Sequence, residues 1–347
     1  MDTRHERDGV DRARRAVLLL GAAGLSSALI GRGRAASAQR ADRLPKVAIL
    51  APSPAADVQT PGSHVHNLLR DLAELGYVDG RNVSFEFRFA AHALERLPGL
   101  AAELVAARPD VLHTWTSGGA RAAAGATSTV PIVVGPANQA TMAALTTDFA
   151  HPAGNVTGFT YTGREEHEAC LRLLKEAAPG VTRVGVLFNP LNPAWRTYPD
   201  VLNEAAGALG LELVRAEARG APELEQAFAA MDARKVDGFF GLGDSTLVAN
   251  PPTLGRIVEL LASRRLPSVS DEGAFVRGGG LLSFHPDDPA IDRGVADYIH
   301  RILQGAKPGE LPVVRPKMLL AVNLKTAQAL GVTLPSPILT RADEVVR

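Results

Sequence analysis

The feature that most constrains the fold of this chain is an alternation of short apolar runs with helical patterns, which occurs twice. Each half contains four such runs, at 46–50, 83–87, 108–115 and 130–134 in the first and at 183–188, 211–216, 234–242 and 265–270 in the second. Short Val-, Ile- and Leu-rich strands that alternate with helices are typical of parallel sheets covered on both faces. The sequence therefore predicts an α/β fold of two doubly wound parallel-sheet lobes with a ligand cleft between them.

Composition and motifs exclude several classes of function. Lys+Arg and Asp+Glu both number 37, so no net charge favours nucleic acid or an anionic membrane. The chain contains no G-x-S-x-G elbow, no Walker loop and no G-x-G-x-x-G fingerprint. The sequence therefore predicts a protein that is not an enzyme, needs no cofactor and binds no nucleic acid.

The first 38 residues have the pattern of an export signal. Arg12, Arg14 and Arg15 precede an uncharged, mostly apolar run at 16–30, and an Ala-Ser-Ala site ends at Ala38. A membrane anchor is the alternative, but the run is shorter than the roughly 20 residues needed to span a bilayer. We expect cleavage near Ala38 and a periplasmic mature protein, by either the general or the twin-arginine route.

A single cysteine limits what the mature chain can do. Cys170 allows no disulfide within the chain, and no lipid-bearing cysteine stands at the cleavage site. In a helical pattern Cys170 shares an apolar stripe with Leu173 and Leu174, so we expect a buried, inert thiol rather than a nucleophile.

Two histidines form the one close pair in the mature chain. His64 and His66 could supply two metal ligands if their stretch were extended, but they open a helical pattern in which positions i and i+2 point apart. We therefore expect solvated or capping histidines and no metal site.

Polar residues follow two strands of the first half. Ser53 comes after the first strand, and Thr116, Ser117, Gly118 and Gly119 open the helix after the third. In open parallel sheets, ligands bind beyond the carboxyl ends of the strands. The helix start, with its free N–H groups and two hydroxyls, is predicted to cradle an anion, although a routine helix cap would have the same residues.

The equivalent turns of the second half carry a carboxylate. Asn189 follows the first strand there and Asp244 follows the third. Paired with an anion cradle, Asp244 would accept the ammonium group of a zwitterion such as an amino acid; alternatively it caps the turn that follows. Ser270 and Asp271, after the fourth strand, are further candidates. The candidate aromatic walls of the cleft are Trp115, Tyr161 and Phe284, each of which could instead serve packing alone.

A family resemblance covers residues 44–345. It is carried by the segments LRDLAELGYVDGRNVSFEFRFA, ERLPGLAAELVAARPDVL, HPAGNVTGFT, LLKEAAPGVTRVGVLFNPLNPA and ILQGAKPGELPVVRPKMLLAVNLKTAQALGVTLP. These segments resemble the ABC transporter substrate-binding family of periplasmic-binding type I fold, in the group related to tryptophan and tyrosine uptake. The resemblance implies a monomer that binds a small solute by hinge closure and meets an ABC permease of the inner membrane transiently.

The resemblance also assigns site residues by position. The family's small polar residue falls on Ser53, its helix start on 116–120, its Asn-Pro turn on Asn189 and its Asp turn on Asp244. This chain departs from the family pattern in two places. Asn138 opens an Asn-Gln-Ala-Thr stretch where relatives usually read Gly-Asp-Pro-Val, and Ser-Phe-His with Phe284 replaces Ser-Tyr-Gly. These changes remove a carboxylate and a phenol that relatives carry near the cleft, so the resemblance alone does not fix the identity of the ligand.

The predicted domains are a signal peptide at 1–38, lobe 1 at 44–157 plus about 285–320, and lobe 2 at 158–284. For the tail at 321–347, the sequence allows a further crossing between the two lobes. Two other functions remain at this point: an exported sensor that acts on a receptor, and a two-domain α/β enzyme with an acid–base or nucleophile site at the cleft.

Overall fold

The computed structural model describes residues 43–161, 163–192, 198–244 and 246–347, which form two compact units. Among the described residues, unit 1 comprises 43–137, 142–160 and Asp288–Val314. Unit 2 comprises Asn138–Thr141, Tyr161–Asp287 and Arg315–Arg347. The predicted signal peptide lies outside the described residues.

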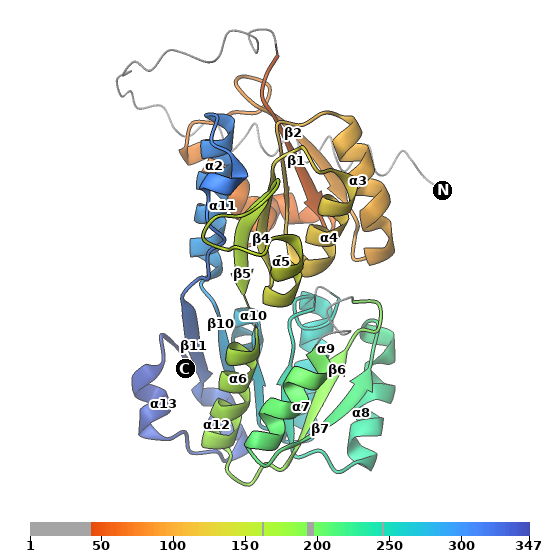
Figure 1. The fold of residues 1–347 in the computed structure, drawn as a ribbon. Helices are drawn as coiled ribbons and strands as arrows, with labels where there is room; N and C mark the ends of the chain where they lie inside the picture. Colours follow the sequence, from red (N-terminus) through yellow and green to blue (C-terminus); the bar gives the residue numbers. More distant parts are fainter. Residues whose placement is uncertain (1–42, 162, 193–197, 245) are drawn as a thin grey trace. The chain divides into compact units, whose positions relative to one another are not determined.

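Unit 1 is built on a five-stranded sheet of order β2-β1-β3-β4-β5 (Figure 1). Its strands are β1 (Lys46–Ala51), β2 (Ser84–Phe89), β3 (Val111–Thr114), β4 (Ile132–Asn138) and β5 (Val156–Tyr161). Its helices are η2 (Ala55–Gln59), α2 (His64–Glu74), η3 (Leu94–Arg96), α3 (Leu97–Ala106), α4 (Thr116–Ala126), α11 (Asp288–Leu303) and η6 (Pro308–Glu310), and α5 (Gln139–Leu145) begins among the residues assigned to unit 2 and ends in unit 1. β1 pairs in parallel with β2 and β3, and β3 pairs in parallel with β4. The carboxyl ends of these strands therefore meet at one edge.

Alternation along the interior strand β1 divides the core of unit 1 into two layers. Val47 and Ile49 pack with α2 and α11 on one face of the sheet. Ala48 and Leu50 pack with α3 and α4 on the other face. A strand buried on both faces is expected of a doubly wound sheet, because successive side chains point to opposite sides.

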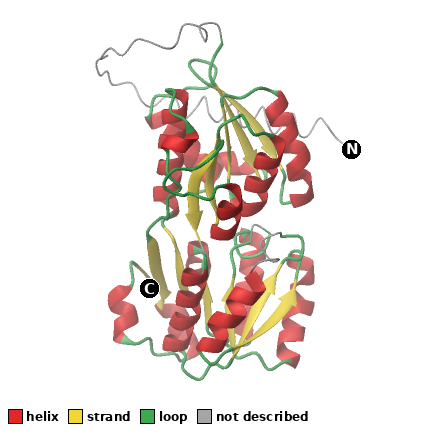
Figure 2. Ribbon diagram, in the orientation of Figure 1, coloured by secondary structure: helices red, strands yellow, loops and turns green. Residues whose placement is uncertain are grey.

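Unit 2 is built on a seven-stranded sheet of order β12-β11-β10-β9-β8-β6-β7. Its strands are β6 (Arg183–Phe188), β7 (Glu212–Glu217), β8 (Gly238–Gly241), β9 (Ser268–Ser270), β10 (Leu282–Pro286), β11 (Met318–Asn323) and β12 (Glu344–Val346). Its helices are α6 (Arg164–Ala177), α7 (Tyr198–Ala208), η5 (Ala221–Glu223), α8 (Leu224–Ala233), α9 (Pro251–Ser263), α10 (Gly273–Arg277), α12 (Leu324–Leu330) and α13 (Ser336–Arg341). Helices again cover both faces of the sheet (Figure 2), which confirms the predicted fold class.

One strand pair of unit 2 runs antiparallel. β10 and β11 pair from Leu282 opposite Val322 to Pro286 opposite Met318, whereas the other pairs described in this sheet are parallel. This pairing keeps both strands in unit 2. The stretch that returns to unit 1 is consequently Asp288–Val314, narrower than the 285–320 expected from the sequence, and the tail from 321 onward belongs to unit 2.

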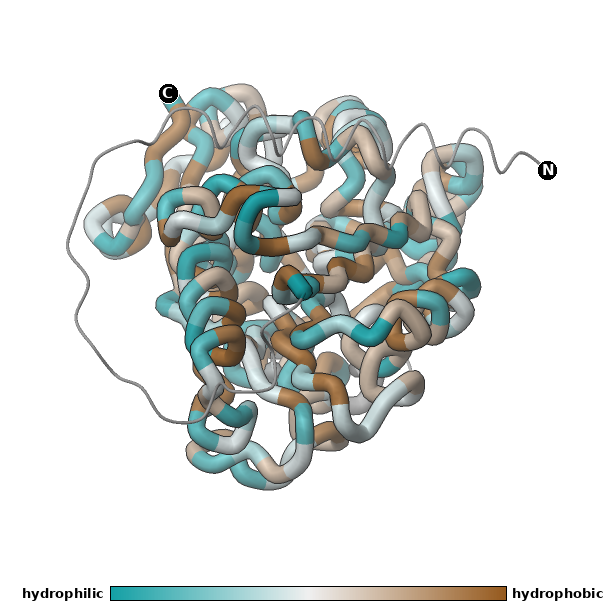
Figure 3. Tube along the Cα trace, turned by 90° about the horizontal axis from the view of Figure 1, so that it is seen from above, coloured by the Kyte–Doolittle hydropathy of each residue, from teal (hydrophilic) through white to brown (hydrophobic). Residues whose placement is uncertain are grey.

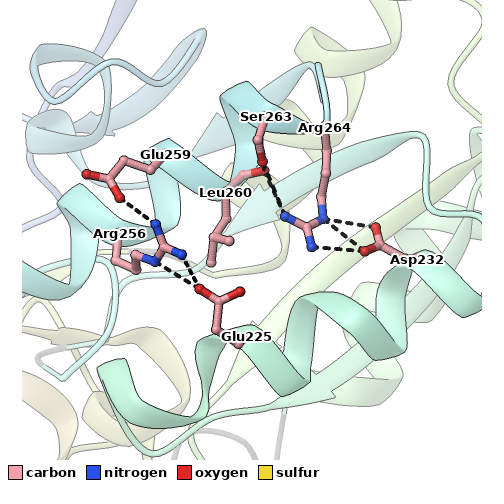
Figure 4. A network of polar contacts seen from close by, with 7 residues as sticks. All are labelled: Glu225, Asp232, Arg256, Glu259, Leu260, Ser263 and Arg264. Atoms are coloured by element: carbon pink, nitrogen blue, oxygen red, sulfur yellow. Dashed lines mark hydrogen bonds and ion pairs between the residues drawn. The ribbon is translucent and has the colours of Figure 1, made fainter.

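Exposed ion pairs join two helices on one face of unit 2 (Figure 4). Arg256 of α9 bonds Glu225 of α8 and Glu259 of its own helix, and Arg264 reaches Asp232 with Nη2–Oδ2 at 2.9 Å. Arg264 also lies over the ring of Phe228, 5.3 Å from its centroid. Exposed pairs of this kind contribute little to stability, about 0–1 kcal/mol each, so the apolar layer beneath them holds the two helices.

The helices that cover the sheets carry both hydrophilic and hydrophobic residues along their length (Figure 3). In α2, for example, the buried residues include Val65, Leu68, Leu69 and Leu72, at the helical spacing of one buried stripe. Of the helices described, none has the length and apolar character that a membrane span requires.

Candidate functional site

The first group of candidate site residues lies where β1 and β2 end in unit 1. Ser53 follows β1, and its Oγ is buried with no hydrogen-bond partner among the described residues. His92 follows β2, and its Nδ1 is likewise buried without a partner there. His92 also adopts a φ of 65°, in the left-handed region that non-glycine residues rarely enter. Sequence reasoning missed His92, because Ala-Ala-His-Ala carries no turn residue that would mark it.

The start of α4 contributes the second group. Thr116 has a φ of 69°, an outlier for a β-branched residue, and its Oγ1 accepts a hydrogen bond from the Gly119 N–H at 3.3 Å. Thr116 therefore caps the helix, and capping and ligand contact remain compatible. A Cβ on Gly119 would lie 2.2 Å from Thr114 Oγ1, so this glycine lets the helix start approach β3 closely. Gly118 and Ser117 complete the turn, and Ser117 is buried.

Trp115, between β3 and α4, is packed by two histidines. Its ring lies 5.6 Å from that of His113 and 5.9 Å from that of His64, centroid to centroid, and the residue is 7% exposed. Burial lowers the pKa of His113 to about 4, and its Nδ1 lies 2.9 Å from the carbonyl oxygen of Val133. His113 is therefore a neutral wall residue.

The predicted histidine pair at the start of α2 has partners within unit 1. His64 Nδ1 lies 2.8 Å from Asp292 Oδ1, and Asn67 donates to the other oxygen of that carboxylate at 2.9 Å. His66 Nδ1 lies 3.2 Å from the carbonyl oxygen of Val58. Throughout the described ranges, no group of three or more His, Cys, Asp or Glu residues is placed to hold a metal ion.

Asp244 is the centre of a buried polar network at the end of β8 in unit 2. Its Oδ1 accepts from the backbone N–H of Thr246 at 2.8 Å and from the hydroxyl of the same residue at 2.5 Å. Its Oδ2 accepts from Asn192 at 2.7 Å, and Asn189 donates to Thr246 Oγ1 at 2.9 Å. The structure thus brings the two predicted residues, Asn189 and Asp244, into one network and adds Asn192 and Thr246. A carboxylate has about four acceptor positions, and the described residues on either side of this network donate to three of those of Asp244.

A second carboxylate continues this network at the end of β9. Asp271 is 3% exposed, and its Oδ1 accepts from the Gly243 N–H at 2.6 Å. Its Oδ2 lies 3.6 Å from Nε2 of the fully buried His167. Ser270 Oγ donates to the carbonyl of Gly241 at 2.7 Å, which ties β9 to β8. Asp271 therefore orients the turn that carries Asp244.

The remaining predicted residues occupy different surroundings. Asn138 ends β4, is 2% exposed and caps α5 by accepting from the Thr141 N–H at 2.7 Å. Tyr161 ends β5 and is half-buried. Phe284 instead lines a cavity of about 250 Å³ with residues of α6, β11 and α13, together with none of the other predicted site residues. Cys170 is fully buried, as predicted, and burial raises the pKa of its thiol.

Comparison with known proteins identifies the family. Residues 56–346 match the family model described as ABC transporter substrate binding protein. The curated "Tyrosine-binding protein" of Clostridioides difficile (strain R20291) is 23% identical over 264 residues, which cover 76% of this chain and 74% of that protein.

Two solved structures share the fold at a TM-score of 0.77. A conserved domain protein from Vibrio cholerae is 29% identical, with 87% of this chain and 100% of that chain covered. An ABC domain from Streptococcus pneumonia in complex with L-Trp is 25% identical, with coverage of 88% and 100%. Together these matches confirm the predicted resemblance, and the chain belongs to the ABC transporter substrate-binding protein family.

Proposed function

We propose that this protein is the exported solute-binding component of an ABC import system and that it captures an amino acid, with an aromatic one favoured. The observation that carries the proposal is the family match over 56–346, with relatives named for tyrosine and L-Trp. The protein binds its solute as a monomer, without a cofactor, and delivers it to a permease of the inner membrane.

The chemistry of the two sets of strand ends supports a zwitterionic solute. Asp244 of unit 2, a buried carboxylate, takes the ammonium group. Ser53 and the Thr116–Gly119 turn of unit 1 supply hydroxyls and the positive end of a helix, which suit an acid group. Trp115 supplies apolar contact, and Ser117, Asn138, Tyr161, Asn189, Ser270 and Asp271 complete the proposed site.

Hinge closure is the proposed mechanism. The chain passes between the units at 160–161, 287–288 and 314–315, so short crossings can bend while each unit keeps its own core. A solute that contacts the strand ends of both units at once binds the closed form better than the open form. Its binding then shifts the population towards closure by that difference in affinity.

Processing is part of the same proposal. We infer that the precursor is exported and cleaved after Ala38, so that the mature protein begins at Gln39 and is periplasmic. Mass spectrometry of the exported protein measures this directly. An intact N-terminus retained in the membrane fraction would argue against release.

A thermal-shift screen of the mature protein tests the function. A ligand present at 1,000 times its Kd stabilises the folded state by about 4 kcal/mol, so a micromolar binder is conspicuous at millimolar concentration. We expect L-tryptophan, L-tyrosine or a related amino acid to give the largest shift in a panel that also contains sugars, nucleobases and organic acids. Stabilisation by another class alone would contradict the amino-acid proposal. Recovery of the ligand chemically altered after prolonged incubation would favour an enzyme instead.

A further inference from the structure

We propose that His92, together with Ser53, binds the acid group of the solute and so selects for it. The inference rests on the proposed function, because it names the part of the solute that unit 1 recognises. It concerns residues of one unit only, at the adjacent ends of β1 and β2.

Backbone hydrogen bonds hold the two loops side by side beyond the strands. The Ala90 N–H donates to the carbonyl of Ala51 at 2.8 Å, which continues the β1–β2 ladder by one step. The His92 N–H then donates to the carbonyl of Pro52 at 2.8 Å, and the N–H of the residue before it donates to that of Ser53 at 3.3 Å. His92 and Ser53 therefore belong to one small, fixed platform at the carboxyl edge of the sheet.

Each residue presents a buried polar atom that nothing in the described chain satisfies. These atoms are Ser53 Oγ and His92 Nδ1. Buried polar side-chain atoms nearly always have a hydrogen-bond partner, so two unpaired ones on adjacent loops require an explanation. A solute that brings acceptor atoms would satisfy both, because a hydroxyl donates and Nδ1 donates in the tautomer that carries the ring proton there.

The backbone of the β2 loop adds an independent observation. Ala91 and His92 have φ values of 51° and 65°, so two successive non-glycine residues adopt the left-handed conformation. A glycine would adopt this conformation without strain, and residues held in it against their preference cluster at functional sites. The strained backbone that carries the His92 imidazole therefore favours a functional role for this side chain.

The neighbouring strand favours a negative partner for these donors. β3 lies next to β1 in the sheet, and α4 begins two residues after β3 ends. The first turn of this eleven-residue helix presents backbone N–H groups and the positive end of the helix dipole at the same edge. A carboxylate oxygen is therefore a better match for Ser53 and His92 than a neutral carbonyl or an ammonium group.

Matched variants of the mature protein test the assignment. His92→Gly removes the imidazole and relieves the strained φ of residue 92. Ala91→Gly relieves the strained φ of the preceding residue and keeps the imidazole. Ser53→Ala removes the hydroxyl. The probes are L-tryptophan and L-tyrosine with their carboxamides, and small carboxylic acids without an amino group. Titration calorimetry measures Kd, and thermal unfolding without ligand measures stability.

We expect His92→Gly and Ser53→Ala each to weaken binding of a carboxylate probe by about 10- to 100-fold, as befits a lost hydrogen bond to a charged group. The same variants should largely abolish the preference for the acid over its carboxamide. His92→Gly should not lower the unfolding temperature, and Ala91→Gly should keep the wild-type Kd. This combination separates a ligand contact from a structural residue, since loss of a structural residue lowers stability and leaves the acid preference intact.

The remaining outcomes distinguish failure of this inference from failure of the proposed function. Wild-type affinity and acid preference in both His92→Gly and Ser53→Ala would overturn the inference and leave amino-acid capture standing. Binding of carboxylic acids but of no amino acid, lost in the two variants, would uphold the inference and overturn the amino-acid proposal. If the wild-type protein bound only carboxamides or no probe of the set at millimolar concentration, both would fall.

Discussion

Replacement of Asp244 by alanine should lower both the stability of unit 2 and the affinity for an amino acid. The hydrogen bonds of Asp244 allow the size of each of the two effects to be estimated separately. The carboxylate is 4% exposed and, among the described residues, accepts two hydrogen bonds from Thr246 and one from Asn192. Asp244→Ala leaves the Thr246 N–H and the Asn192 amide without this acceptor. At about 1–3 kcal/mol for each buried donor, and with water able to enter the vacated space, we expect a loss of about 2–4 kcal/mol. For a domain of this size that lowers Tm by roughly 5–15 °C.

The effect on binding should be larger than the stability loss can explain. If Asp244 accepts the ammonium group, its removal leaves one partner of a buried charge pair unpaired, at about 2–5 kcal/mol. The Kd of the amino acid should then rise by roughly 30- to several-thousand-fold. Asp244→Asn keeps the size of the side chain but loses its charge, and should weaken binding in the same direction.

Asp237 provides the matched control at the other end of the same strand. It immediately precedes β8, and its carboxylate accepts hydrogen bonds from three donors, the Thr182 N–H and hydroxyl and the Arg183 N–H, at 2.7–3.1 Å. Asp237→Ala should therefore destabilise unit 2 while the Kd stays within about twofold of wild type, because stability and affinity effects at separate sites are independent.

The assay is titration calorimetry well below the Tm of the least stable variant, with the amino acid that gives the largest thermal shift. Near-ultraviolet circular dichroism confirms that each variant is folded before titration. A folded Asp244→Ala protein with wild-type Kd would refute the ammonium assignment and reduce Asp244 to a turn cap.

Three further perturbations test the structure around the site. Burial lowers the pKa of His113 to about 4, so between pH 6.5 and 4 the unfolded chain binds a proton at this residue that the folded chain does not. The free energy of unfolding should therefore fall by about 3 kcal/mol from pH 6.5 to 4. In urea unfolding, His113→Gln should flatten this dependence on pH. Gly119→Ala should destabilise unit 1 by about 1–3 kcal/mol, because the added Cβ would overlap the Thr114 side chain of β3. Gly125→Ala on the same helix, where a Cβ would have nothing within 4 Å, should stabilise the protein by up to about 1 kcal/mol. Equal Tm values for the two variants would contradict the close approach of α4 to β3. Cys170 should react with a thiol reagent only as fast as unit 2 unfolds, since burial raises the pKa of its thiol, and labelling of the native protein within minutes would show otherwise.

The sheets were predictable from the sequence because their signal is local. Runs such as 46–50 and 183–188 are mostly apolar segments between helical patterns, and they form the interior strands β1 and β6. Ligands bind beyond the carboxyl ends of parallel strands, so strand direction alone is enough to predict Ser53 and Asp244 as site residues.

Features that depend on distant partners could not be predicted in this way. The antiparallel pairing of β10 with β11 is set by register across a stretch of chain that passes through unit 1. The left-handed backbone at His92 follows from its bonds to the β1 loop, and no glycine in the sequence marks it. The position of Phe284 in the sequence predicts an aromatic wall of the cleft, whereas in the structure Phe284 lines the cavity beside α6 and α13.

Small-angle X-ray scattering of the mature protein with and without its amino acid tests the central claim most directly. If the two units close on the ligand as rigid bodies about the crossings at 160–161, 287–288 and 314–315, as proposed, the radius of gyration should be smaller at saturation. The same measurement on Asp244→Ala at an amino-acid concentration that saturates only the wild type should show the unliganded value. An unchanged radius for the wild-type protein at proven saturation would contradict capture by closure.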